Sequence, residues 1–407
     1  MGSDTLGYSY AREFYKHYGV KSLLLSSVNA RYVSLSKFLD CEIVPGIDKE
    51  DVLVDWLRKN APRFKDAAPI VFSGTGDWRI RTLSKHKEEL TALGYYIPAI
   101  DFPLLDKISQ KDIFYSYCAK LGVPFPKTRA WCFNGYKLEE EFAGLTQIDS
   151  FDELRTLEYP LIAKPSNSAD WHFANIPDQH KIYTIKDADQ LEKIIKDLQA
   201  SPYAHALLLQ EMLATDDESL HTITTFSDAE GNMLVGVTGD VILQSHTKTG
   251  IGNPLVILGR RKYTKILDSA AKLLKEWKYE GFANFDVMDG ADGEPRFLEI
   301  NTRPGRNTYY FSLAGCPFVK PMVEYYINGD TKLACLTEEE RRADKPFLFS
   351  MVGRDIALSY AHGENLAAAT KHFDEGTWQN PLLCKEDSLL QKIFAKKYVK
   401  STESNNI

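Results

Sequence analysis

Two acidic residues, Asp286 and Glu299, lie in stretches of alternating apolar and polar residues on either side of Asp292-Gly293. Because Asp-Gly favours a tight hairpin turn, the stretches are predicted to pair as antiparallel strands with Asp286 opposite Glu299. Asn284 then lies opposite Asn301 on the same face. Facing carboxylates repel each other, and a divalent cation bound between them removes this penalty. The pattern predicts a Mg²⁺ site with Asp286, Glu299 and Asn301 as ligands. An acidic hairpin that faces only solvent is the alternative.

The residues that precede this hairpin must form the scaffold that positions it. Over 1–102 we expect helices at 4–17 and 52–60 and strands at 21–27 and 69–72. Alternation of this kind favours a parallel sheet with crossover helices. Gly2-Ser3-Asp4 is typical of the loop that follows a first strand, so we expect a further strand before it in a longer parent chain.

A second unit is predicted to begin near residue 103. Ser109 is expected to cap a helix over 111–121, and Asp187 a helix whose apolar residues recur with helical spacing. A buried strand over 159–165 carries Lys164 near its end. Strands over 206–211, 222–226 and 233–238 and a helix over 265–277 then lead into the carboxylate hairpin.

Composition limits the classes to which the chain can belong. Its 407 residues are 44% hydrophobic and 26% charged, which is typical of a globular protein with two or three domains. A net charge of −7 gives no basic surface for nucleic acid, and no apolar run approaches the roughly 20 residues that span a bilayer. The six cysteines show no metal-ligand spacing and fit reduced thiols in a cytoplasmic protein.

Four signals follow one another in an order that resembles the ATP-grasp superfamily, in which two α+β lobes hold ATP and Mg²⁺. They are Lys111 in Lys-x10-Gly-Val-Pro, Lys164 in Tyr-Pro-Leu-Ile-Ala-Lys-Pro, the segment 210–213 with Glu218, and the carboxylate hairpin. The resemblance implies a mixed α/β and α+β protein. It would have a Rossmann-like domain over 1–102, ATP-grasp lobes over 103–207 and 208–335, and a C-terminal extension over 336–407.

The resemblance also implies a contact for each part of the nucleotide. Lys111 and Lys164 would bind phosphates, helped by Ser166 and Ser168 in the loop after the second lysine. That loop departs from the family pattern, because many members have a glycine-rich loop here and this chain has none in 166–172. The implied adenine and ribose contacts are Gln210, Glu211, Met212, Leu213 and Glu218, and the implied ligands of one or two Mg²⁺ (or Mn²⁺ in its place) are Asp286, Glu299 and Asn301.

Three shorter motifs narrow the resemblance to bacterial carboxylate–amine ligases of the D-aspartate ligase group. They are Lys164–Asp170, the opening Gly-Ser-Asp-x5-Tyr-Ala-Arg-x-Phe, and Trp378–Leu382. In such ligases a carboxylate attacks the γ-phosphorus of ATP, and an amine then displaces phosphate from the acyl phosphate. The implied acid is D-aspartate, and the implied amine is a lysine side chain of a UDP-linked peptidoglycan precursor. Nothing in the residues themselves distinguishes D-aspartate from another small acid.

Phosphoryl transfer needs positioned positive charge rather than a protein nucleophile, and the sequence shows no nucleophile motif. Arg303 and Arg306 are candidates for binding the transferring phosphoryl group or a substrate carboxylate. The segment Ser245–Asn253 is a candidate lid with Lys248 or His246 facing the substrate. Ordinary surface arginines and a plain surface loop are the alternatives.

Other functions stay open on sequence alone. A ligase for other amino acids and a carbamoyl-phosphate-synthase-like carboxylase share the fold, although a carboxylase should keep more of the glycine-rich loop. A non-catalytic nucleotide-binding protein should have lost a lysine or a carboxylate, and none is missing. A dinucleotide oxidoreductase is disfavoured because the segment 74–79 lacks the third glycine of G-x-G-x-x-G. The sequence leaves a homodimer open.

Overall fold

The computed structural model describes residues 1–138, 144–171, 174–213, 216–247, 250, 252–260 and 263–405. The chain divides into two compact units. Unit 1 consists of Met1–Phe102, Asp217–Asn284 and Asn301–Ile407, and unit 2 of Pro103–Asp216 and Phe285–Ile300. Residues 336–407 therefore share a unit with the N-terminal residues. The division of the sequence into four domains stays a prediction.

The N-terminal part of unit 1 opens with helix α1 (Thr5–Tyr18). Asp4 caps this helix, because its carboxylate accepts a hydrogen bond from the Gly7 amide at 2.8 Å. Strands β1 (Ser22–Ser26) and β2 (Leu39–Ile43) pair in parallel. A parallel sheet was predicted here, but β2 was not among the predicted strands. The helices of this part are α2 (Arg31–Ser34), α3 (Glu50–Asn60), α4 (Asp77–Lys85) and α5 (Lys87–Ala92). The predicted helices over 4–17 and 52–60 are thus confirmed.

The strand predicted over 69–72 is wrong, because within this segment only Ile70 forms a bridge, to Tyr96. An apolar cavity of about 510 Å³ borders both this segment and β1. The chain start lies here: the Met1 ammonium donates to the Phe72 carbonyl and the Gly2 amide to the Leu25 carbonyl, each at 2.9 Å. The expected strand before Gly2 stays a prediction.

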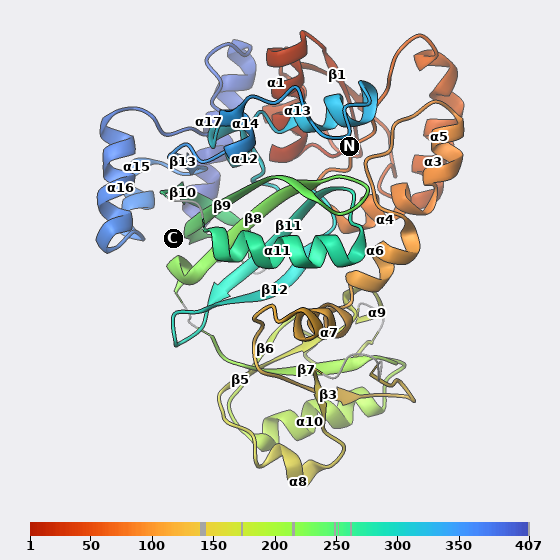
Figure 1. The fold of residues 1–407 in the computed structure, drawn as a ribbon, viewed down its shortest axis with the longest axis vertical. Helices are drawn as coiled ribbons and strands as arrows, with labels where there is room; N and C mark the ends of the chain where they lie inside the picture. Colours follow the sequence, from red (N-terminus) through yellow and green to blue (C-terminus); the bar gives the residue numbers. More distant parts are fainter. Residues whose placement is uncertain are drawn as a thin grey trace. The chain divides into compact units, whose positions relative to one another are not determined.

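A six-stranded sheet forms the centre of Figure 1, in the order β12-β11-β8-β9-β10-β13. Helix α11 (Thr264–Trp277) packs against β9 because its buried side chains, among them Leu267, Leu273 and Leu274, lie on one side of the helix. Hairpin β8–β9 and helix α11 confirm the predicted elements. The strands are β8 (Leu220–Ser227), β9 (Met233–Gln244), β10 (Pro254–Gly259), β11 (Gly281–Asp289), β12 (Pro295–Asn301) and β13 (Phe347–Ser350).

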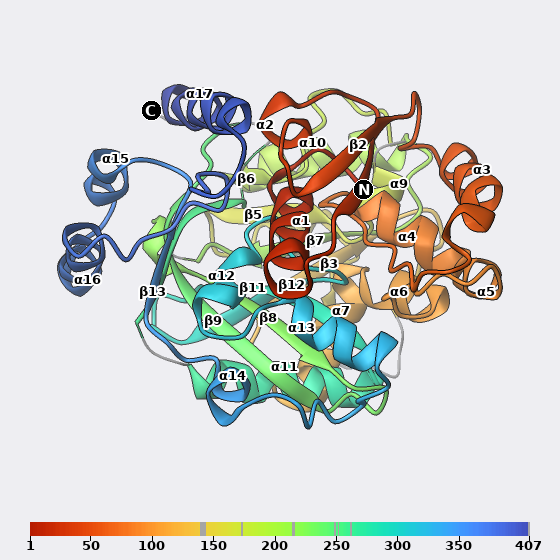
Figure 2. The ribbon, with the colours of Figure 1, turned by 90° about the horizontal axis from the view of Figure 1, so that it is seen from above.

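The C-terminal residues of unit 1 form helices that were not predicted from the sequence. The long helix α17 (Leu389–Asn405) packs against α2, and the two lie side by side in Figure 2. Buried Ala395 of α17 belongs to the same hydrophobic core as Leu6 of α1. The other elements are α12 (Tyr309–Leu313), α13 (Val319–Met322), a π-helical turn (Val323–Ile327), α14 (Glu338–Arg342), α15 (Arg354–Ser359) and α16 (Gly363–Asp374).

Unit 2 is built on a five-stranded sheet in the order β4-β3-β7-β5-β6. Its neighbouring strands are antiparallel except for the short β3–β4 pair. The elements are α6 (Phe102–Ile108), α7 (Lys111–Leu121), β3 (Thr128–Cys132), β4 (Thr146–Gln147), α8 (Phe151–Leu154), β5 (Leu161–Pro165), α9 (Ser168–Trp171), β6 (Tyr183–Ile185), α10 (Ala188–Gln199) and β7 (Ala206–Glu211).

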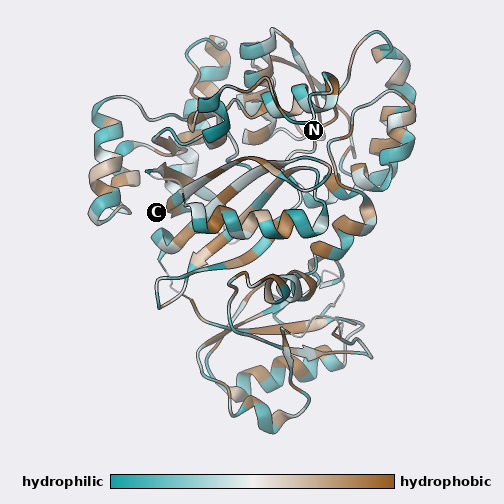
Figure 3. Ribbon diagram, viewed as in Figure 1, coloured by the Kyte–Doolittle hydropathy of each residue, from teal (hydrophilic) through white to brown (hydrophobic). Residues whose placement is uncertain are grey.

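The two helix caps predicted for unit 2 have different outcomes. Asp187 caps α10 by accepting from the Gln190 amide at 2.9 Å, and the mixed colouring of α10 in Figure 3 reflects its amphipathic sequence. Ser109 does not cap α7. Its hydroxyl donates instead to the Leu105 carbonyl of α6, and Gln110 occupies the N-cap position. A preceding helical turn therefore offered the serine a closer acceptor. Across the described ranges, no helix combines the length and apolarity needed to cross a bilayer.

Candidate active site

The hairpin that carries the predicted metal ligands turns over five residues. The Gly293 amide donates to the Gly290 carbonyl and the Gly290 amide to the Glu294 carbonyl, each at 2.9 Å. Gly293 adopts a left-handed conformation with φ of 72°, which is the bulge position of a type I turn followed by glycine. Gly290 therefore lies opposite Glu294, and the predicted two-residue turn is wrong by one position in register.

This shift bears on the predicted pairing of Asp286 with Glu299. Next to the turn, the rings of Phe285 and Phe297 are 5.7 Å apart, although the predicted register would place them on opposite faces. An unbroken ladder with the observed register would also separate Asp286 from Glu299, because a one-residue slip reverses every side chain. Their opposition requires a second bulge and stays a prediction. Asn284 has a local role, since its side-chain oxygen accepts from the Thr224 hydroxyl at 2.9 Å.

Two lysines and one of these carboxylates meet within unit 2. The Lys111 ammonium lies 2.9 Å from a Glu299 carboxylate oxygen. The Lys164 ammonium donates to the Tyr115 hydroxyl at 2.9 Å, and Tyr115 donates to the Leu298 carbonyl at 2.6 Å. Lys111 and Tyr115 are one turn apart on α7, Lys164 lies on β5, and Glu299 on β12. We call Lys111, Lys164, Tyr115 and Glu299 the charge cluster.

Burial gives the charge cluster unusual electrostatics. Lys164 is only 8% exposed, and burial together with the nearby Lys111 ammonium lowers the pKa of Lys164 to about 7. The Lys111 ammonium holds the pKa of Glu299 well below its usual range, so this carboxylate stays ionised. The partly exposed Glu299 carboxylate pairs with Lys111, so a protonated Lys164, which contacts the neutral Tyr115, adds positive charge that Glu299 does not balance. The cluster is therefore suited to an anion that carries several negative charges, such as a polyphosphate.

The loop after Lys164 supports α7 through its backbone. The Ser166 carbonyl accepts from the Lys111 amide at 3.0 Å, and the buried Ser166 hydroxyl oxygen accepts from the Ala206 amide at 3.2 Å. Ser166 thus fixes the relative position of β5, β7 and the start of α7. Ser168 begins α9, and its side chain lies outside the described residues.

The predicted adenine segment begins at the end of β7. Gln210 is buried and donates to the Thr128 hydroxyl at 2.7 Å, and Glu211 accepts from the Lys127 amide at 2.8 Å. Both side chains therefore hold the sheet together. A cavity of about 520 Å³ borders Gln210 and Glu211. The last two residues of the segment, Met212 and Leu213, follow the strand, and Met212 is 37% exposed.

Glu218, the predicted ribose ligand, lies in unit 1 and has partners that the sequence did not reveal. Its carboxylate accepts from the His362 amide at 3.1 Å and from the Asn365 side chain at 2.9 Å. The His362 ring nitrogen Nδ1 lies 2.8 Å from the second carboxylate oxygen. Because these partners come from the start of α16, more than 140 positions away, no local pattern could have indicated them.

The basic candidates of unit 1 differ in their surroundings. Arg303 forms an ion pair with Asp77 at 2.7 Å and donates to the Asn301 side chain at 3.4 Å, so it links the end of β12 to the start of α4. Arg306 is exposed and lines a separate cavity of unit 1. His246 of the predicted lid pairs with Asp217 at 2.9 Å. Lys248 lies outside the described residues.

The predicted metal ligands form a sparse donor set. In the described part of the chain, no three or more His, Cys, Asp and Glu side chains are grouped so as to hold a metal ion. Mg²⁺ does not require such a cage, because it is typically held by one or two carboxylates together with substrate phosphates and water. The ionised Glu299, with Asp286 and the amide oxygen of Asn301, is chemically a fitting set for this metal.

Comparisons with known proteins identify relatives of this chain. Residues 183–324 match the family model described as carbamoyl-phosphate synthase L chain, ATP binding domain. The chain is 26% identical to the D-aspartate ligase of Enterococcus faecium (strain Aus0004), over 98% of this chain and 93% of that protein.

Solved structures share the fold at low sequence identity. An L-amino acid ligase from Bacillus licheniformis has a TM-score of 0.54 at 15% identity, covering 84% of this chain and 76% of its own. The biotin carboxylase domain dimer of the Hydrogenobacter thermophilus 2-oxoglutarate carboxylase, solved with MgADP, ADP and bicarbonate, has a TM-score of 0.56 at 16% identity, covering 83% and 70%. The chain has the ATP-grasp fold.

This assignment confirms the predicted fold and the predicted resemblance to ATP-grasp carboxylate–amine ligases. The curated relative and the family model support the predicted class of enzyme, an ATP-dependent ligase that forms C–N bonds. Within this ATP-grasp chain, sequence reasoning missed Tyr115 as a partner of Lys164 and His362 as a partner of Glu218. Tyr115 could have been found, because it follows Lys111 by four residues on a predicted helix and so shares its face.

Proposed function

We propose that this ATP-grasp chain joins the side-chain carboxylate of D-aspartate to an amine, at the expense of ATP. The charge cluster carries the proposal, because buried lysines with uncompensated positive charge match a polyphosphate. The 26% sequence identity to a D-aspartate ligase, over 98% of this chain, supports the choice of acid. The lysine side chain of a UDP-linked peptidoglycan precursor is the proposed amine, which would place the reaction in the cytoplasm.

In this proposal the protein positions the reactants and neutralises charge. A carboxylate oxygen of the acid attacks the γ-phosphorus of ATP, and ADP leaves. The amine then attacks the acyl carbon, phosphate leaves, and an amide forms. Lys111 and Lys164 hold phosphate oxygens, and Tyr115 orients Lys164 through its hydroxyl. No protein nucleophile is needed, since aligned reactants and charge stabilisation supply most of the acceleration.

Asp286, Glu299 and Asn301 are the proposed ligands of one or two Mg²⁺, for which Mn²⁺ can substitute. When bound, the metal neutralises phosphate charge that develops during transfer. Glu299 can exchange its ion pair with Lys111 for such a metal, because its carboxylate is already ionised. Arg303 and Arg306 are proposed to bind the acid or the transferring phosphoryl group, and Lys248 to face the substrate. Glu218 and the Gln210–Leu213 segment are proposed to bind the nucleoside.

Trapping of the activated acid tests this function directly. The protein is incubated with ATP, Mg²⁺, hydroxylamine and single D- or L-amino acids, and acyl hydroxamate and ADP are measured. We expect a signal with D-aspartate that exceeds those of L-aspartate and D-alanine. A stronger signal with another acid would keep the ligase and replace the substrate, whereas hydroxamate from none of them would contradict the proposed reaction.

A further inference from the structure

Arg306 opens onto a cavity of about 400 Å³ that is built wholly within unit 1. Its walls come from the start of α1, the segment before β10, the residues after β12, strand β13 and helix α17. Small-molecule sites commonly have volumes of about 300–1,000 Å³, so the cavity is large enough for an amino acid.

The charge of the described lining favours an anion. Among the lining residues that the structure describes, Arg306 alone has a formal charge, and none is an aspartate or a glutamate. In the described part of the chain, no carboxylate lies within ion-pair distance of Arg306. Asp4 lies close by in sequence to the lining residue Thr5, but its carboxylate binds the Gly7 amide and the amide and hydroxyl of Thr75. An anion that enters the cavity therefore meets the Arg306 guanidinium and, among the described lining residues, no carboxylate.

A second observation points to a ligand with an acceptor group. Asn307 lines the cavity, is only 5% exposed, and has a buried side-chain nitrogen without a hydrogen-bond partner among the described residues. A buried donor of this kind destabilises a protein unless an acceptor satisfies it. Asn307 directly follows Arg306, so an unsatisfied donor adjoins the cation along the chain.

Helix α17 supplies the polar wall of the cavity. Its lining residues recur at helical spacing and so share one face: Tyr398, Ser401, Thr402 and Asn405. The helix is fixed in place, because Glu403 accepts from the Gly353 amide at 2.6 Å and Gln391 donates to the Tyr32 and Leu382 carbonyls at 3.0 Å. The wall is therefore part of the folded unit.

We infer that this cavity binds the carboxylate of the acid substrate that is not activated, and that α17 sets which acids fit. The inference rests on the proposed ligase function and narrows its substrates to small dicarboxylic acids. Arg306 and Asn307 recognise the carboxylate, and the side chains at 401 and 405 limit the length of the acid.

Binding without nucleotide tests the cavity separately from turnover. The melting temperature of the full chain is measured during titration with D-aspartate, succinate, D-alanine and inorganic phosphate. We expect saturable stabilisation by the two dicarboxylates only, and loss of that stabilisation in Arg306→Met. Stabilisation by phosphate alone would overturn the inference, as would equal stabilisation by D-alanine.

A matched pair of variants tests the α17 wall. Ser401 and Ser404 are both exposed on α17, but Ser401 lines the cavity, whereas Ser404 does not line it and donates to the Lys400 carbonyl. We expect Ser401→Phe to raise the dissociation constant of D-aspartate by about tenfold, the scale of steric selection in a fitted pocket. Ser404→Phe should leave it unchanged. Equal effects of the two variants would overturn the role of α17.

Turnover separates this inference from the function on which it rests. If the wild type forms acyl hydroxamate, Ser401→Phe should raise KM for the acid and leave KM for ATP unchanged. An unchanged KM for the acid would overturn the cavity assignment and retain the ligase. If no acid gives hydroxamate, the proposed reaction fails, and the titrations still decide whether the cavity binds dicarboxylates.

Discussion

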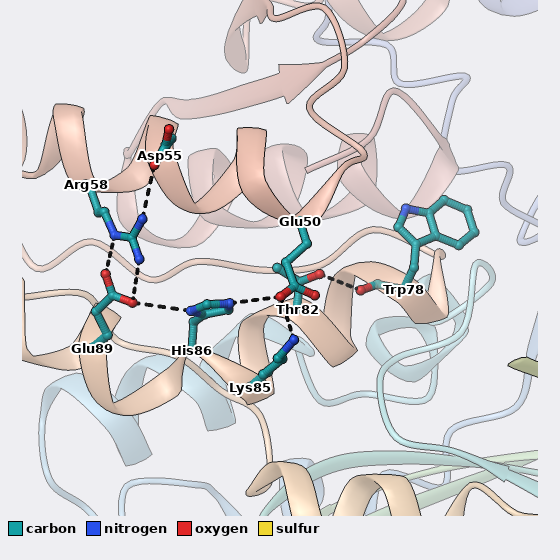
Figure 4. A network of polar contacts seen from close by, with 8 residues as sticks. All are labelled: Glu50, Asp55, Arg58, Trp78, Thr82, Lys85, His86 and Glu89. Atoms are coloured by element: carbon teal, nitrogen blue, oxygen red, sulfur yellow. Dashed lines mark hydrogen bonds and ion pairs between the residues drawn. The ribbon is translucent and has the colours of Figure 1, made fainter.

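Two groups of opposite charges in this molecule differ mainly in burial. In the charge cluster of unit 2, Lys111 has an 11% exposed side chain. In unit 1, α3, α4 and α5 carry a surface network in which Glu50, Lys85, His86, Glu89 and Arg58 form a continuous chain of contacts (Figure 4). There the paired Lys85 and Glu50 side chains are 51% and 45% exposed.

The difference shows that buried charges, unlike exposed ones, can favour the binding of a charged ligand. In the surface network every cation has a carboxylate, and water screens each pair, so the contacts contribute little stability. In the charge cluster Glu299 pairs with Lys111 while Lys164 contacts the neutral Tyr115, and the pKa of Lys164 falls to about 7 because solvation is lost. A bound polyphosphate would stabilise the Lys164 ammonium in place of the water that burial excludes. The network stabilises a fold surface, whereas the cluster is arranged for a ligand.

Loss of the shared carboxylate should have the largest effect. Glu299→Ala removes the ion-pair partner of Lys111 and a proposed metal ligand. We expect Mg²⁺-dependent ADP release to fall about 10²–10³-fold, the scale seen when one charge-stabilising group is lost. Glu294→Ala, an exposed glutamate in the same hairpin, is the control and should retain activity. Full turnover by Glu299→Ala would remove the metal role from this residue.

A smaller effect is expected from a residue that only positions a lysine of the charge cluster. Tyr115→Phe removes the hydroxyl between Lys164 and the Leu298 carbonyl, which leaves both without this partner. We expect KM for ATP to rise by roughly 5–15-fold, since one buried hydrogen bond contributes about 1–1.5 kcal/mol. The pH profile should shift with it, because Lys164 loses a fixed acceptor. A change in melting temperature with unchanged kinetics would make the hydroxyl purely structural.

The depressed pKa of Lys164 predicts proton uptake on nucleotide binding. At pH 8 the free ammonium is mostly deprotonated, because its pKa is about 7, and bound phosphates should raise that pKa again. Calorimetry with MgADP in buffers of different ionisation enthalpy should therefore reveal uptake of up to about one proton at pH 8 and little at pH 6. Lys164→Arg, which keeps its charge, should bind without this uptake. Equal proton uptake in the wild type and in Lys164→Arg would show that another group takes up the proton.

The lowered pKa of Lys164 also makes the stability of the folded protein depend on pH. The native Lys164 pKa lies below the unfolded value of 10.5, so the unfolded chain binds more protons between the two values. This residue therefore favours the folded free protein increasingly as pH rises from about 7 toward 10.5.

Removal of the contact between His362 and Glu218 should have a moderate effect on nucleotide binding. If Glu218 binds the ribose, His362 and Asn365 compete with the nucleotide for its carboxylate. His362→Ala should then lower KM for ATP by roughly 2–5-fold, as expected when one competing hydrogen bond of about 0.5–1 kcal/mol is removed. His372→Ala, near the other end of α16, serves as the control. A raised KM would indicate that His362 supports the nucleotide site.

The sequence predicted local structure well because helical and strand periodicity reflect nearby residues. The range of α7 matches its prediction, and Asp187 caps α10 as expected. The hairpin turn failed for a local reason, since Gly293 takes the bulge position of a longer turn rather than a central position of a two-residue one. That single error shifts the register of the proposed metal ligands.

Long-range contacts could not be read from the sequence. Lys111 and Glu299 are separated by most of unit 2 and by a stretch of unit 1, and only the family resemblance indicated that they belong together. The α17 wall was missed because Ser401 and Asn405 look like an ordinary polar tail. Only the structure shows that Ala395 of this helix is buried in the core of unit 1 and that Ser401 and Asn405 line the cavity.

The smallest effect should come from the surface network, which completes the comparison. Arg58 lowers the pKa of Glu89 to about 2 through its hydrogen bonds, so the contribution to stability is present above the ordinary value of 4.5 and is lost as pH falls toward 2. Glu89→Gln should slightly lower the melting temperature at pH 7, and 1 M salt should remove the difference because exposed pairs are screened. ADP release should not change, whereas Glu299→Gln in the charge cluster should impair it at either salt concentration. A Glu89→Gln loss of activity would show that the network does more than stabilise a surface, and it would break the contrast between the two regions.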